Sequence, residues 1–124
     1  MRLGGLLTVL LALSVLGCGI PASPADQAEA VDSVAAEGAL LAEDAAAGDT
    51  TAAFVETHSE ALAKSARELA DGASSPQLRQ IAGRVVTALE RLHSEPADRT
   101  AAAAAAHELA RASNQAGALA KSGG

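Results

Sequence analysis

Signals for the start of a helix recur four times in this chain, and their spacing limits the possible fold more than any other feature. Ser23-Pro24 combines a capping side chain with proline at the first helical position. Further signals lie at residues 48–51, 74–77 and 94–98, and either Ser74 or Ser75 provides the third cap. We therefore expect helices at residues 24–47, 51–71, 76–93 and 97–120.

Between these signals, apolar residues recur at the 3.6-residue period of a helix, and no segment alternates as a strand would. The short connections place consecutive helices antiparallel. Alanine accounts for 33 of the 124 residues, and Phe54 is the sole aromatic residue. Alanine favours helix but contributes little energy when it is buried. We predict an all-α protein, namely an antiparallel up-down four-helix bundle of modest stability that follows a cleaved signal peptide.

The apolar stripes of the second and third helices differ in kind. The third stripe is entirely apolar and consists of Leu78, Ile81, Ala82, Val85, Leu89 and Leu92. The second stripe includes polar residues and consists of Phe54, Val55, His58, Leu62, Ser65 and Leu69. We expect both stripes to face the core.

The chain begins with one basic residue and a short apolar run. Residues 1–18 read MRLGGLLTVLLALSVLGC, in which Arg2 precedes an uncharged stretch at residues 3–16. As a helix, these residues would extend about 21 Å, which is less than a membrane-spanning helix requires. This pattern is typical of a secretory signal peptide. The alternative is a retained membrane anchor, although no basic cluster follows the run.

The junction Val15-Leu16-Gly17-Cys18 resembles the lipobox of bacterial lipoproteins. The resemblance implies that the Cys18 thiol is diacylglycerylated, that the chain is cut before Cys18, and that palmitate-type chains hold the protein on the outer side of a bacterial membrane. It divides the chain into a signal peptide at 1–17, a tether at 18–22 and a bundle at 23–122. Ordinary secretion with cleavage near Ala22 is the alternative. The mature part resembles small alanine-rich lipoproteins of GC-rich bacteria, a likeness of composition that implies no activity.

Composition excludes several classes of function. The formal net charge is −6, and there is one aromatic residue, so the chain lacks both the cationic face and the stacking side chains of nucleic-acid-binding proteins. A single cysteine excludes an intrachain disulfide and a cysteine-based zinc site. We therefore expect no nucleic-acid partner.

Charge is distributed unevenly along the chain. Residues 18–50 carry seven acids and no Lys or Arg, whereas residues 76–124 carry four acids and six bases. One interpretation is that the two halves complement each other within the molecule. The other is that the acidic half forms a docking face for a basic partner or for cations of the cell wall.

Glu90 and His93 form one Glu-x-x-His pattern, which ferritin-like bundles use twice to build a dinuclear metal site. Here the pattern occurs once and the helical period turns Glu90 outward, so we predict no metal site. His93 is better explained as a residue that interacts favourably with a helix C-terminus. His107 falls on the polar side of the fourth helix and requires no special role.

His58 is the polar residue that the helical period places in the core. A buried imidazole needs hydrogen-bond partners, and Glu108 and Glu37 lie near the stripes of the neighbouring helices. We expect a buried pair between His58 and one of these glutamates.

No residues form a catalytic arrangement, and alanine-lined interfaces leave little room for a substrate pocket. We expect a membrane-anchored envelope lipoprotein, not an enzyme, that acts as a structural or protein-interaction module without a cofactor. Its partners would be the membrane, through Cys18, and an envelope protein. The alternative is an envelope bundle that binds a ligand or metal through His58 and nearby carboxylates.

Overall fold

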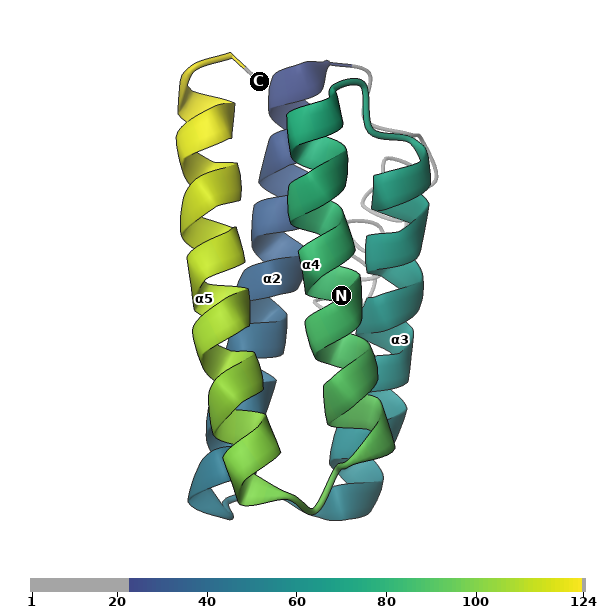
Figure 1. Ribbon diagram of the computed structural model, residues 1–124, viewed down its shortest axis with the longest axis vertical. Helices are drawn as coiled ribbons and strands as arrows, with labels where there is room; N and C mark the ends of the chain where they lie inside the picture. Colours follow the sequence, from purple (N-terminus) through teal and green to yellow (C-terminus); the bar gives the residue numbers. More distant parts are fainter. Residues whose placement is uncertain (1–22, 124) are drawn as a thin grey trace, which may run out of the picture.

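The computed structural model describes residues 23–123, and within that range the chain folds into four helices without a strand (Figure 1). The helices are α2 (Pro24–Ala47), α3 (Ala52–Asp71), α4 (Pro76–Ser94) and α5 (Arg99–Lys121). The all-α prediction is confirmed. The signal peptide, the tether and the lipidation site, which we predicted at 1–17, 18–22 and Cys18, lie outside the described residues.

Three of the four helices begin where the sequence predicted, give or take one residue, because a hydroxyl side chain caps each of them. Ser23 Oγ accepts from the Asp26 backbone N–H at 3.0 Å, and Thr51 Oγ1 accepts from that of Phe54 at 3.1 Å. At α4 the cap is Ser75, whose Oγ accepts from the Leu78 N–H at 3.1 Å. This contact decides between the two capping residues that the sequence left open.

The fourth helix begins two residues later than predicted. Ser94 is the last residue of α4, and its Oγ donates to the Glu90 carbonyl within that helix at 3.0 Å. Asp98 caps α5 instead, because its Oδ1 accepts from the Ala101 N–H at 3.0 Å. A carboxylate is well suited to this position, since it also interacts favourably with the positive end of the helix dipole.

Contacts between helices show that neighbours run in opposite directions. Gln27, near the start of α2, donates through Nε2 to the carbonyl of Gly72 after α3 at 3.1 Å. His93, near the end of α4, lies beside the Glu56 carbonyl near the start of α3. In Figure 1 the four helices alternate in direction, and the two ends of the described chain lie at the same end of the bundle.

In the core, α4 contributes leucine, isoleucine and valine together with two alanines, whereas α2 and α5 contribute mainly alanine. Every member of the predicted α4 stripe is buried. The α2–α5 pair has the most extensive packing in the bundle. At its centre Gly38 allows close approach, since a Cβ there would lie 2.9 Å from Leu89 Cδ2 and 3.2 Å from Leu109 Cδ1. Small residues therefore bring the helices together, as expected of an alanine-rich interior.

The prediction for the core face of α3 is correct for Val55 and Leu62 but wrong for Phe54, His58 and Ser65, so the buried face is turned relative to the predicted one. The buried residues of this helix are Val55, Ser59, Leu62, Ala63 and Ala66. Phe54 is 54% exposed, the His58 side chain is 38% exposed, and Ser65 is exposed. The physical reason is that α3 packs more extensively on α4 than on α2, which turns its buried face toward α4.

Among the helices of residues 23–123, none has the length and apolar character that crossing a membrane requires.

Candidate functional site

Two large apolar side chains of the described region are exposed, and they identify the candidate site. Leu40 in α2 is 64% exposed and Phe54 in α3 is 54% exposed. Single exposed apolar residues are common on protein surfaces and need no explanation. Phe54 differs because it is the chain's sole aromatic residue and forms part of a specific arrangement.

Phe54 is held in place by the first turn of α3. Its backbone N–H is bound by the capping side chain of Thr51. Its ring stacks on that of His58, one turn later, with the centroids 5.4 Å apart and the planes inclined by 14°. Residues four apart on a helix lie on the same face, so this stack is built from local helix geometry. The aromatic ring is therefore presented to solvent in a defined orientation.

His58 lies at the edge of α3 and not in the core. Its Nε2 is 3.9 Å from Glu37 Oε2 of α2, and both side chains are substantially exposed, at 38% and 58%. One of the two predicted partners is therefore near His58, but the prediction of a buried pair is wrong. Glu108, the other predicted partner, is exposed and faces a groove between α4 and α5.

The stacked rings of Phe54 and His58, with Glu37 beside them, form what we call the Phe54 surface, and Leu40 lies one helical turn beyond Glu37 on α2. Glu37 and Leu40 are three residues apart on α2, and this spacing places them on adjoining parts of the helix surface. Leu40 is 17 residues beyond Ser23, which corresponds to about 25 Å along the helix. The Phe54 surface is therefore well separated from the end of the bundle at which the described chain begins.

The surroundings of this surface are acidic. The hairpin of α2 and α3, with the flanking turns, covers residues 23–75 and carries eleven acids against Lys64 and Arg67. Arg67 Nη1 pairs with Glu90 Oε2 of α4 at 3.1 Å. Within residues 23–123, no acid of this hairpin lies within 4.0 Å of a Lys or Arg of α4 or α5. The distribution of charge along the sequence suggested that the basic half of the chain neutralises the acidic half, but direct ion pairs do not do so.

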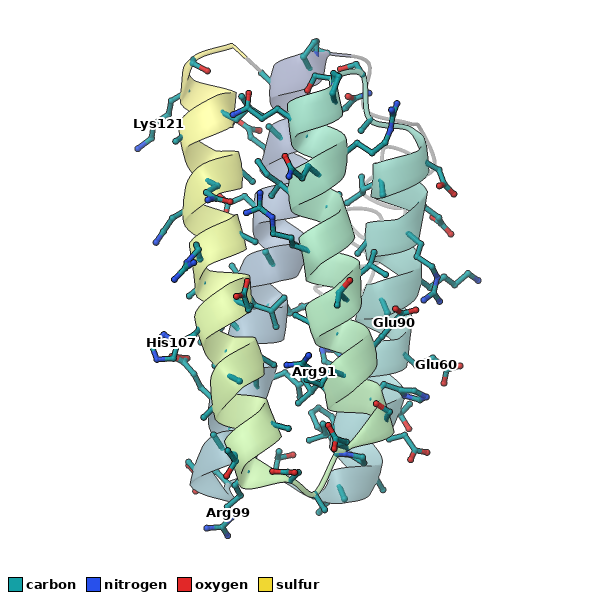
Figure 2. The ribbon with its side chains drawn as sticks, in the orientation of Figure 1. Glu60, Glu90, Arg91, Arg99, His107 and Lys121 are labelled. Carbon is teal, nitrogen blue, oxygen red and sulfur yellow. The ribbon has the colours of Figure 1, made fainter. Side chains whose placement is uncertain are left out.

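The other histidines do not form a ligand set with His58. His93 Nδ1 is 2.9 Å from the Glu56 carbonyl oxygen, so His93 joins two helices. Glu90 of the Glu-x-x-His pattern points outward to Arg67, and His107 is exposed on α5 (Figure 2). Among the described residues there is no group of three or more His, Cys, Asp or Glu side chains that could hold a metal ion.

No protein-family model matches this chain, and no curated protein or solved structure is significantly similar to it. Its function is therefore inferred from its own residues and their arrangement.

The sequence identified Phe54 and His58 but assigned them to the core. A signal for the correct orientation was present, because Ser59, Ala63 and Ala66 recur at helical spacing beside Val55 and Leu62, which the predicted stripe already contained. Small residues can line a core as well as a surface, so this second stripe does not stand out. Leu40 was not identified, because an isolated leucine on a polar face carries no periodic signal.

Proposed function

We propose that this protein is a lipid-anchored, non-catalytic interaction module of the bacterial cell envelope. Its lipidated Cys18 holds it on the outer side of a membrane, and the bundle presents the Phe54 surface to a basic protein partner. The Phe54 surface is the observation that carries the proposal. It places an oriented aromatic ring on an acidic hairpin whose carboxylates form no ion pairs with Lys or Arg of α4 or α5 in the described range.

The anchor is supported by the Gly17-Cys18 junction at the end of a short apolar run. One acyl chain holds a protein only transiently, whereas two or three chains give stable attachment, at about 0.8 kcal/mol for each buried CH₂ group. Lipidation also removes an otherwise free thiol from an oxidising compartment. A palmitate-type anchor at Cys18 therefore accounts for both the position and the number of cysteines.

The partner is supported by the chemistry of the Phe54 surface. Aromatic side chains are enriched at the centres of protein interfaces, where they provide a large contact area. The surrounding acids favour association with a basic partner and disfavour an acidic one. They also disfavour contact with an anionic lipid surface, so we assign this face to a protein.

The anchor is tested by replacing Cys18 with serine in the full chain. We expect Cys18→Ser to abolish acylation, so that the protein leaves the membrane fraction or remains unprocessed at the precursor size. Membrane fractionation with mass spectrometry of the amino terminus measures both results. A serine variant that stays in the membrane fraction at the mature size would contradict the anchor.

The partner is tested by placing a photo-crosslinking amino acid at position 54 of the full chain in intact cells. We expect one dominant adduct with a basic protein, reduced about tenfold when Glu37→Lys is added, because reversal of a charge at an interface is strongly unfavourable. The matched control places the crosslinker at Ala110, an exposed residue of α5. Equal adducts from the two positions, or none from position 54, would exclude the proposed docking face.

A further inference from the structure

A second surface feature, unrelated to the Phe54 surface, lies between α4 and α5. It is a groove of about 310 Å³, which is at the small end of the range for ligand sites. It is lined by five residues of α4 between Gly83 and Arg91, and by Ala104, Ala105 and Glu108 of α5. Figure 2 shows Arg91 between α4 and α5.

The groove remains open at Gly83, where no packing constraint requires glycine. A Cβ placed there would meet no atom within 4 Å, whereas one at Gly117 would lie 3.1 Å from Asp32 Oδ2. Glycine inside a helix costs about 1 kcal/mol relative to alanine. The bundle thus contains a destabilising residue at a position where a side chain would occupy the groove.

The groove combines an apolar floor with cationic ends. Ala88, Ala104 and Ala105 provide the floor. Arg84 Nη1 donates to Gln115 Oε1 at 2.9 Å, and this bond fixes one guanidinium at the edge. The guanidinium of Arg91, which also lines the groove, has no hydrogen bond or ion pair to another residue of the 23–123 range. Its guanidinium is therefore available for an external anion.

The lining restricts the chemistry of that anion. Glu108 on the opposite wall disfavours a ligand with several negative charges. No aromatic side chain lines the groove, so a nucleobase would lack a stacking partner. A carboxylate matches the planar fork of Arg91, and an unbranched alkyl chain matches the alanine floor.

We propose that the α4–α5 groove binds a medium-chain carboxylate, with its head on Arg91 and its alkyl chain over Gly83 and the alanine floor. This inference does not depend on the Phe54 surface or on its partner. The ligand is an amphipathic monoanion, so both its charge and its alkyl chain contribute to recognition.

The experiment uses membranes that carry the full chain and a ten-carbon carboxylate with a diazirine in its alkyl chain. After photolysis we expect labelling on the tryptic peptides that cover residues 80–84, 85–91 and 100–111, displaced by excess decanoate. Arg91→Gln should lower the labelled fraction about tenfold, the effect of losing a charge-assisted hydrogen bond of ordinary strength. Gly83→Leu should lower it similarly, because the leucine side chain fills the groove.

Two variants serve as controls, because both alter exposed α5 residues that do not line the groove. Arg111→Gln is the control for Arg91→Gln, because it removes the same charge outside the groove. Ala110→Leu is the control for Gly83→Leu, because it adds the same side chain outside the groove. Both controls should leave labelling unchanged. A probe with an amine in place of the carboxylate should label these peptides weakly. Absent or evenly distributed labelling, equal labelling by the amine, or labelling insensitive to Arg91→Gln and Gly83→Leu would overturn the proposal.

Discussion

Gly38 and Gly83 both lie inside helices, but their surroundings differ. At Gly38 a Cβ would come within 2.9 Å of Leu89 and 3.2 Å of Leu109, and both leucines are completely buried. At Gly83 the same atom would meet open space. One glycine is therefore required by packing between helices, and the other is not.

This difference gives a prediction for two matched variants. Gly83→Ala should raise the free energy of unfolding by about 0.5–1 kcal/mol, because alanine is the better helix former and nothing obstructs it. Gly38→Ala should lower the free energy of unfolding by about 1–3 kcal/mol, since the leucines must move within a packed core. Urea denaturation followed by circular dichroism measures both. Equal effects of the two variants would show that Gly38 is not a point of close approach.

Residue size explains which core positions could be predicted. Every residue of the predicted α4 stripe is buried, because leucine, isoleucine and valine mark one face of that helix without ambiguity; the prediction missed only the small Ala88, which is also buried. In α3 the largest side chain of the apparent stripe is Phe54, which is exposed, while Ser59 is fully buried. Periodicity does not show whether a large side chain packs inside or remains available to a partner. That choice depends on how α3 packs between α2 and α4.

At the scale of elements, the starts of the four helices were the most predictable feature, because each start depends on a few local atoms. The serine and threonine caps satisfy backbone N–H groups that the first turn leaves free. The last boundary was less predictable, because Ser94 and Asp98 are both good caps in sequence. The structure shows Ser94 bonded within α4, so only Asp98 is available to begin α5.

The caps also provide a prediction at this scale, with neighbouring serines as variant and control. Ser75→Ala should lower the free energy of unfolding by about 1 kcal/mol, because the Leu78 N–H loses its partner. Ser74→Ala should change it little, since Ser74 contacts Gln27 through its backbone N–H, which alanine retains. Thermal unfolding of both variants measures the difference. A larger loss from Ser74→Ala would show that Ser74, and not Ser75, caps α4.

At the scale of the whole molecule, the arrangement of helices separates charge. The acidic α2–α3 hairpin lies beside an α4–α5 hairpin that carries a small positive excess. Within the described part of the chain, the ion pair between them joins Arg67 of the acidic side to Glu90 of the other. The helices pack mainly through apolar residues, so ion pairs contribute little to this arrangement. The acids consequently remain on the surface, where they repel one another and favour a basic partner.

This repulsion predicts how salt affects stability. In a fragment that begins at Ser23, raising NaCl from 0.01 to 0.5 M should raise the melting temperature by about 2–5 °C, because the screening length falls from about 30 Å to a few ångströms. The comparison variant combines Glu29→Gln, Glu60→Gln and Glu68→Gln, three exposed acids without ion pairs to described residues. Its melting temperature should be higher than that of the wild type at low salt and should respond less to salt. Subtracting the salt-induced change in melting temperature of the variant from that of the wild type leaves the part that is caused by these three charges. An equal salt response would mean that α4 and α5 compensate the acids at longer range, and the acidic hairpin would then have no excess charge to offer a basic partner.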